Sequence, residues 1–473
     1  MSRIFFFSLI RLSFSSSLTV TPKACFYTSE DGIGTLSSCE ELTPDSSWKL
    51  ALSDQPQQII DGFGAAWTDA TTYTLDTLKK EDQETLLKRL FTNEGIAMKF
   101  MRMTVGQSDL TPPSDGRWSF DESILPDPDL TKFSLTTPGE RMLSWIMRMK
   151  DVADVLLLGS IWSPPGWMKQ NNNLRWEYID SYVNYIITYL QTYADNGVEV
   201  SAMTLQNEPL HSAAPAWTMK MDQVRACELA LRDIFFLRNS YNSHVQSYAA
   251  ILTNKTSEAI AAATFNTKIW AYDHNTDHPE YPQYVLDNTA NGAVDAVAWH
   301  CYGGGFEGLA PFVEANPGVK QYMSECWLHS TTGEGFFDLP QFLLRPIQYG
   351  ASGSLAWTLG GSVDLDVSYP GGCQQCTGLV QVDMKNATYT LTQDYYNLGQ
   401  FSKYVEKGAR YLPVSGSYVY DDNTGVEAVG FQNPDGSDVV VVLNKFGSNL
   451  ALELDVGGGG SCVLRWRLGV SRH

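Results

Sequence analysis

The chain has 473 residues, of which 43% are hydrophobic and 18% charged, and its formal net charge at pH 7 is -20. This composition is ordinary for a globular protein and excludes a disordered chain, while the length predicts one large domain and one smaller one. The acidic balance disfavours nucleic acid and anionic membranes as partners, because their phosphates are bound by surfaces rich in Lys and Arg.

The chain begins with MSRIFFFSLIRLSF, in which Arg3 precedes an apolar run. This pattern resembles a secretory leader, so residues 1–24 are predicted to be a leader peptide and the protein to be secreted. Two glycosylation sequons, at Asn254 and Asn386, agree with secretion. No apolar run reaches the roughly 20 residues that a membrane-spanning helix needs, so no stable membrane insertion is expected.

The eight cysteines also fit an oxidising compartment. Two disulfides are predicted, Cys25–Cys39 and Cys373–Cys376. The second pair forms a CxxC motif without another pair or nearby histidines, so a tight bridge in a loop is favoured over a zinc site. Cys227 and Cys301 are predicted to be buried thiols.

Between residues 57 and 387, strand-like and helix-like segments alternate. Eight segments read as buried strands: IIDGFGAAW, MKFMRMTV, DVLLLGSIW, VSAMTLQ, TKIWAYDH, AVDAVAWHCY, VKQYMSE and GSLAWTL. Eight strands in strict alternation with helices favour an α/β fold of the closed (β/α)8, or TIM-barrel, type over an open doubly wound sheet. Residues 57–387 are therefore the predicted barrel.

From residue 388 the pattern changes to short strands separated by Gly, Asn and Asp, such as GVEAVGFQN and DVVVVLNKF. We predict an additional all-β domain, a β-sandwich, over residues 388–473. Residues 25–56, which contain the strand-like SWKLALS, are predicted to contribute to it. Residues 235–263 look like an insertion before the fifth barrel strand, and the tail from residue 457 leaves the closure of the β domain open.

Two glutamates stand at the carboxyl ends of predicted barrel strands, where barrels of this type carry their chemistry. Glu208 follows the fourth strand in TLQNEP, and Glu325 ends the seventh in YMSECW. Alone, Glu208 would equally fit a helix cap or an ion pair with an arginine. Two carboxylates that face one cleft are what glycoside hydrolysis requires, because one protonates the departing oxygen and the other attacks the anomeric carbon.

Several segments resemble glycoside hydrolase family 30, the glucosylceramidase-like family of retaining β-glycosidases. They are DGFGAAWTDA (61–70), FMRMTVGQSD (100–109), SIWSPPGWMK (160–169), TLQNEP (204–209), WHCYGG (299–304), YMSECW (322–327) and YNLGQFSKYVEKGAR (396–410). IWAYDHNTDHPEYP (269–282) looks particularly like the fungal endo-β-1,6-glucanase branch. The resemblance covers most of residues 57–450.

The resemblance implies that Glu208 is the general acid/base, protonated at rest, and that Glu325 is the ionised nucleophile. It further implies sugar-binding or supporting roles for six residues: Asn207, Asp109, Trp162, Arg102, Tyr302 and His300. Among these, Asn207 would bind the sugar 2-hydroxyl and Arg102 would lie beside Glu325 and keep it charged. His300 is expected to support the site instead of acting as a base.

The predicted function is that of a secreted, retaining endo-β-1,6-glucanase that acts on a polysaccharide as a monomer, without cofactor or metal. An exo-acting glucosylceramidase and an inactive carbohydrate-binding protein are the alternatives. GGGFEG (303–308) fits a dinucleotide-binding template, but eight alternating units argue against the open sheet that such a site needs.

Overall fold

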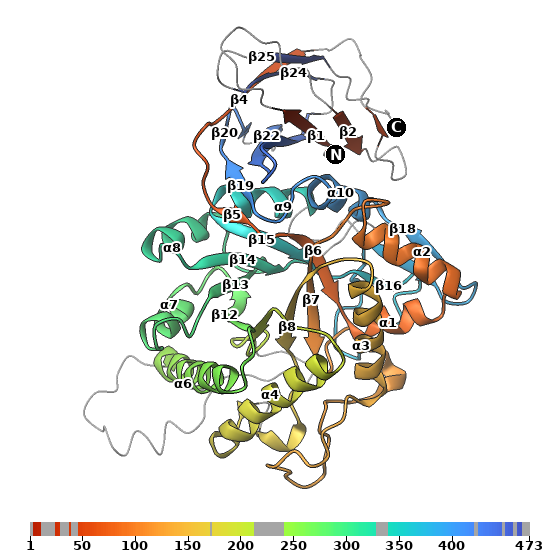
Figure 1. The fold of residues 1–473 in the computed structure, drawn as a ribbon, viewed down its shortest axis with the longest axis vertical. Coiled ribbons are helices and arrows are strands. Elements are labelled where there is room, and N and C mark those ends of the chain that lie inside the picture. Colours follow the sequence, from red (N-terminus) through yellow and green to blue (C-terminus); the bar gives the residue numbers. More distant parts are fainter. Residues whose placement is uncertain are drawn as a thin grey trace.

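The computed structural model shows a barrel with a β-rich domain packed on one side of it (Figure 1). It describes residues 3–10, 24–28, 37–38, 46–170, 173–211, 241–327, 339–420, 424–446, 450–456 and 461–465. Cys39 and Cys227 lie outside these residues, so the Cys25–Cys39 bridge and the Cys227 thiol stay predictions.

Eight parallel strands close into a barrel, which confirms the predicted (β/α)8 architecture. Each of the eight apolar segments overlaps one of these strands. In chain order they are β6 (Gly62–Trp67), β7 (Phe100–Val105), β8 (Leu156–Ile161), β11 (Ala202–Thr204), β12 (Lys268–Asn275), β13 (Ala296–His300), β14 (Lys320–Glu325) and β15 (Ala351–Ala356). Burial of these strands on both faces explains why the segments are almost continuously apolar.

Helices cover the outside of the barrel (Figure 1). They are α1 (Asp69–Asp76), α2 (Lys80–Phe91), α3 (Thr136–Lys150), α4 (Ile179–Asp195), α6 (Tyr241–Ala262), α7 (Glu280–Asp287), α8 (Leu309–Ala315), α9 (Leu339–Gln348) and α10 (Gln393–Ser402). Residues 241–262 of the expected insertion form α6, which packs against α4 and α7. They supply a crossover helix of the kind that a parallel strand pair requires, and the interpretation of residues 235–263 as an insertion stays a prediction.

The interior of the barrel has an apolar layer below a polar one. Near the amino-terminal ends of the strands it is filled by Phe100, Leu158, Ala202, Trp270, Ala296, Ala298, Tyr322 and Leu355. Side chains two residues further along a strand point inward again. In this way Arg102, Ser160, Thr204, His300 and Ser324, all fully buried, form a polar layer towards the carboxyl ends. The barrel mouth therefore contains a buried polar cluster.

The β domain consists of two sheets, which agrees with the predicted β-sandwich. One sheet has the order β3-β2-β1-β23-β22-β19-β5, with β21 beside β22; the other has the order β20-β4-β24-β25. Their bounds are β1 (Arg3–Ile10), β2 (Ala24–Thr28), β3 (Ser37–Ser38), β4 (Ser46–Leu52), β5 (Ile59–Ile60), β19 (Ala409–Leu412), β20 (Val414–Ser415), β21 (Tyr418–Val419), β22 (Gly425–Gln432), β23 (Ser437–Asn444), β24 (Leu450–Asp455) and β25 (Ser461–Arg465). Apolar side chains from both sheets, including Leu52, Val442 and Leu454, form the core between them.

The first of these sheets is buried on its other face against the barrel. Phe431 of β22 contacts Phe63 of β6, with ring centroids 6.2 Å apart, and Phe63 packs on Phe401 of α10 at 5.1 Å. The β domain and the barrel therefore share one continuous core. Residues of the predicted leader form β1, which pairs antiparallel with β23, and the leader itself stays a prediction.

A smaller sheet beside the barrel is formed by β16 (Gly360–Ser362), β17 (Val380–Asp383) and β18 (Thr388–Leu391). The loop between β16 and β17 contains the CxxC motif, and Cys373 and Cys376 form the predicted disulfide. Cys301 is not the free thiol that was expected, because it is bonded to Cys326. The two cysteines follow the ends of the neighbouring strands β13 and β14, which the parallel register brings together.

Candidate active site

Asp273 is the central acceptor of the polar layer, and sequence reasoning did not find it. Its carboxylate is fully buried and accepts five hydrogen bonds. Those to Oδ2 come from Arg102 (2.9 Å), Ser160 (2.7 Å) and Thr204 (2.6 Å), and those to Oδ1 from His300 (3.0 Å) and Ser324 (2.6 Å). Although burial opposes it, the charge of Arg102 lowers the pKa of Asp273 well below its ordinary value. Asp273 is therefore a permanently charged anchor for its neighbours.

A β-bulge in β12 explains why Asp273 points into the barrel. Strict alternation from the inward Trp270 would place Tyr272 inside. The register with β13 shifts between Tyr272 and His274, and both Tyr272 and Asp273 have left-handed backbone, with φ of 79° and 60°. Tyr272 consequently packs in the outer core, and Asp273 turns inward.

Arg102 connects Asp273 to Glu325, one of the two predicted glutamates. Its Nη1 lies 2.5 Å from Oε2 of Glu325, and its Nη2 donates to Oδ1 of Asn207 at 2.5 Å. The other oxygen of Glu325, Oε1, accepts a hydrogen bond from the hydroxyl of Tyr302 at 2.9 Å. Glu325 is thus held by a donor at each oxygen, and Nδ2 of Asn207 is buried with no acceptor among the described residues.

Glu208 lies in the loop after β11 with left-handed backbone, φ 46°, which costs free energy for a residue with a Cβ atom. Two main-chain hydrogen bonds fix this loop to neighbouring strands. The amide of Asn207 donates to the main-chain oxygen of Ile161, and the amide of Glu208 donates to the main-chain oxygen of Asp273. The Glu208 side chain is 15% exposed, whereas that of Glu325 is 4% exposed. Glu208 is therefore the glutamate that is more open to solvent.

His300 brings the two glutamates together. Its Nδ1 lies 3.1 Å from Oε1 of Glu208 and 3.8 Å from Oε1 of Glu325. The two glutamate oxygens are no farther apart than the sum of these distances. That limit admits the separation of about 5–5.5 Å that retaining glycosidases use.

The charges around His300 set the protonation of this cluster. Although burial opposes it, the charge of Glu325 and the hydrogen bonds with Asp273 and Glu208 raise the pKa of His300 to about 9. Burial alone would raise the pKa of Glu208, but the hydrogen bond and charge of His300 lower it to about 2. In the free site the proton between them is therefore bound to His300, which differs from the expectation that Glu208 holds it at rest.

Glu325 is subject to opposing influences. Burial raises its pKa above the ordinary value, and the positive charges of His300 and Arg102 oppose that rise. Glu208 and Asp273 add to the rise as like charges. A proton that enters this cluster is consequently shared among neighbouring groups, and the two glutamates titrate as a pair.

Asp109 lies near both glutamates, and Trp162 is connected to the cluster through Trp357, over whose ring Arg102 lies at 5.8 Å. Burial and the charge of Glu325 raise the pKa of Asp109 to about 7. Trp162 stacks on Trp357, with ring centroids 5.2 Å apart and an interplanar angle of 16°, and its Nε1 is buried with no acceptor in the part of the chain that the structure describes. All eight residues predicted for the site therefore belong to one cluster at the barrel mouth.

A second histidine, His274, was also missed. It is buried, its Nδ1 lies 3.9 Å from Oε1 of Glu208, and burial lowers its pKa to about 4. Within the described ranges, Glu208, His274 and His300 are the one set of side chains whose ligand atoms, all within 4.8 Å of one another, could hold a metal. A cation there would replace the hydrogen bond between Glu208 and His300.

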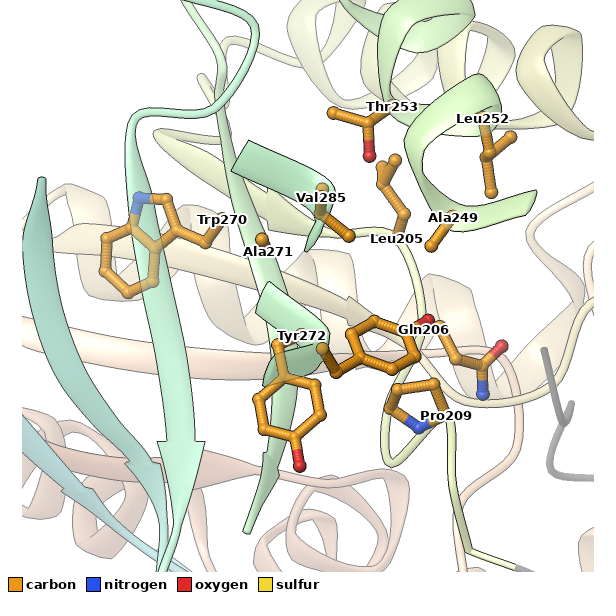
Figure 2. Close-up of a pocket in the computed structure, with 11 residues that line it drawn as sticks. Leu205, Gln206, Pro209, Ala249, Leu252, Thr253, Trp270, Ala271, Tyr272 and Val285 are labelled. Carbon is orange, nitrogen blue, oxygen red and sulfur yellow. The ribbon is translucent and has the colours of Figure 1, made fainter. Parts of the chain in front are cut away.

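A small cavity lies on the outer side of the Glu208 loop, between β11, β12, α6 and α7 (Figure 2). Gln206, Pro209 and Tyr272 border it on the side of the loop, and apolar residues such as Leu252 of α6 and Val285 of α7 close it. The carboxylates of the cluster do not line it, so it is separate from the barrel mouth. No helix in the described part of the chain has the length and apolarity to span a bilayer.

Comparisons with known proteins agree with this geometry. The model of the glycosyl hydrolase family 30 TIM-barrel domain matches residues 60–237, and that of the family's beta-sandwich domain matches residues 408–465. The chain is 38% identical over 434 residues to an endo-1,6-beta-D-glucanase of Neurospora crassa, covering 88% of this chain and 85% of the relative. It is also 38% identical over 443 residues to one of Aspergillus fumigatus, with the same two coverages.

Among solved structures, an endo-beta1,6-glucanase superimposes with a TM-score of 0.77 over 98% of this chain and 97% of that one. The two sequences are 21% identical, so this likeness concerns the fold.

Proposed function

Because the chain belongs to glycosyl hydrolase family 30 and is a glycoside hydrolase, we propose that it is a secreted endo-β-1,6-glucanase that retains the anomeric configuration. The β-1,6 linkage is proposed because the chain is 38% identical, over most of both chains, to relatives named for this activity. The leader-like start and the sequons support secretion.

The geometry supports a double displacement with Glu325 as nucleophile. Its carboxylate attacks the anomeric carbon, and Glu208 protonates the departing glycosidic oxygen, which gives a glycosyl ester on Glu325. Glu208 then takes a proton from water as that water hydrolyses the ester. Glu208 suits the leaving-group side because it is the more exposed of the two glutamates, and His300 supplies a proton 3.1 Å away.

The neighbouring residues receive roles from their contacts. Arg102 and Tyr302 orient the nucleophile through its two oxygens. The amide of Asn207, which Arg102 fixes through Oδ1, presents Nδ2 to the sugar 2-hydroxyl. Asp109 and Trp162 bind the remaining face of the sugar that is cleaved.

The function is tested by incubating the purified protein with linear β-1,6-glucan, with β-1,3-glucan and glucosylceramide as controls. A ladder of short β-1,6-oligosaccharides, first released as the β-anomer in a proton NMR time course, is the expected result. Release of glucose alone, or cleavage of the lipid alone, would overturn endo-glucanase action. First release of the α-anomer would overturn the retaining mechanism.

The two glutamate roles are separated by adding azide to alanine variants with an activated aryl β-glucoside. Glu325→Ala leaves room for azide to attack the anomeric carbon directly, so an α-glucosyl azide is expected. Glu208→Ala still forms the glycosyl ester, which azide then opens to a β-glucosyl azide. The same anomer from both variants would refute the assignment.

A further inference from the structure

The loop that carries the CxxC motif presses against Asp109. We call residues 369–376 the disulfide turn. The amide of Tyr369 donates to the main-chain oxygen of Asp109 at 2.9 Å, and the amide of Cys373 donates to its Oδ2 at 3.2 Å. A Cβ atom on Gly372 would lie 2.4 Å from the Asp109 main-chain oxygen, so only glycine permits this approach. The turn thus contacts both the main chain and the carboxylate of Asp109.

The second oxygen of the same carboxylate has no such contact. Oδ1 of Asp109 is buried, and no group in the described part of the chain donates to it. Buried carboxylate oxygens normally accept hydrogen bonds, so an oxygen left over beside Glu325 and Glu208 is suited to a ligand hydroxyl. Trp162 and Cys376 belong to one apolar cluster beside it, which gives the site a nonpolar wall and one polar acceptor.

The bridge within the turn acts locally. Cys373 and Cys376 are three positions apart, and a loop this short restrains the unfolded chain little. Its main effect is to fix the path of the turn, and hence the direction of the Cys373 amide. Gln375, in the same turn, is exposed, which provides a control position.

We propose that the disulfide turn is a positioning element of the sugar site, in which the Cys373–Cys376 bridge holds the Cys373 amide against Asp109 and so aims the free oxygen of that carboxylate at a hydroxyl of the sugar being cleaved. The proposal rests on the proposed function, because it assigns Asp109 to the bound sugar. Cys373 does not touch the sugar. It acts through Asp109.

A double-mutant cycle tests this coupling. Replacing both cysteines by alanine should lower kcat/KM on β-1,6-glucan by about tenfold, which corresponds to the loss of about one hydrogen bond. Asp109→Asn should lower it further. Because the turn acts through Asp109, adding the cysteine changes to Asp109→Asn should cost nothing more. Gln375→Ala should match the wild type, and the cysteine variant should lose no more than about 2 °C of thermal midpoint, the entropic effect of so short a loop.

Two outcomes would overturn the proposal. One is a cysteine variant within twofold of the wild type, and the other is a full tenfold loss in the Asp109→Asn background. If the cysteine variant does not fold, Gly372→Ala replaces it, because this change displaces the turn and keeps the bridge. It should show the same loss and the same dependence on Asp109.

Failure of the turn and failure of the proposed function are distinguishable. The same variants are placed in a Glu325→Gln background, and the dissociation constant of a β-1,6-linked gluco-oligosaccharide is measured by calorimetry. If the cysteine changes weaken binding about tenfold, the positioning role of the disulfide turn is supported, even if the wild type does not hydrolyse β-1,6-glucan. Equal binding in all variants refutes it.

Discussion

Replacing Asp273 by asparagine should damage both stability and activity, although Asp273 is not placed at the reacting atoms. The amide is almost the same size as the carboxylate, but it has one acceptor where Asp273 uses two. The asparagine amide can take two orientations. In one its NH2 group faces the donors His300 and Ser324, and in the other it faces Arg102, Ser160 and Thr204. The change also removes the negative charge that lies between two buried cations.

The magnitude follows from the burial of these groups. Removing one partner of a buried ion pair costs about 3–5 kcal/mol, because the remaining charge is left uncompensated. For a chain of 473 residues, an unfolding entropy of about 2.1 cal/mol/K per residue gives about 1 kcal/mol per degree. The thermal midpoint should therefore fall by about 3–5 °C. Turnover should fall by about 10²–10⁴-fold, the usual size of a lost acid–base contribution, because Arg102 and His300 lose their common anchor.

Asp69 offers a matched control. It is also fully buried and accepts hydrogen bonds from Thr111 and Trp118, but burial raises its pKa to about 7. At acidic pH Asp69 is already neutral, so Asp69→Asn preserves both its charge and its bonding pattern. At about pH 5, which lies below the pKa of Asp69 and above that of Asp273, calorimetry and kcat/KM should show a small effect for Asp69→Asn and a large one for Asp273→Asn. Equal thermal midpoints and activities within threefold would refute the reasoning.

Three more predictions follow from single features. The native state keeps the proton of Asp69 up to about pH 7, whereas the unfolded chain loses it near pH 3.9, so the free energy of unfolding should fall as pH rises between these values. Urea titrations at about pH 4.5 and 7.5 should show a smaller fall for Asp69→Asn than for the wild type. An equal fall in the two proteins contradicts this prediction. Replacing both Cys301 and Cys326 by alanine should lower the thermal midpoint in calorimetry by about 3 °C, because their bridge closes a loop of some 25 residues. An unchanged thermal midpoint contradicts this prediction. After secretion from a eukaryotic host, glycopeptide mapping should find a glycan on Asn386, which is exposed in the turn before β18. It should find none on Asn254, because the Asn254 side chain in α6 accepts a hydrogen bond from the amide of Ala290. The reverse pattern contradicts the prediction.

Periodic burial made the scaffold predictable. Strands buried on both faces leave near-continuous apolar runs, and eight such runs identified every strand of the barrel. Glu208 and Glu325 were identified for the same reason, because a charged residue at the end of an apolar run is an exception to the pattern that burial dictates. The resemblance to a family added the polar residues around them.

Asp273 and the Cys301–Cys326 bridge were not predictable from such patterns. Alternation along β12 assigns the inward position to Tyr272, and only the bulge reverses it. The bridge depends on the parallel register that places Cys301 and Cys326 on neighbouring strand ends, and register is a property of paired strands that a single segment does not encode. Both features arise from contacts between segments distant in the sequence.

The charge balance of the cluster connects its stability to its chemistry. Two cations, Arg102 and His300, face three carboxylates, those of Asp273, Glu208 and Glu325. A buried network with one surplus negative charge is costly, and the binding of one proton removes the surplus. His300 lowers the pKa of Glu208 to about 2, whereas burial raises that of Glu325, so this proton is shared among the buried groups around Glu325 and His300, and His300 delivers it to Glu208 across 3.1 Å. The feature that makes the network expensive to bury is therefore the one that supplies an acid where a departing oxygen needs it.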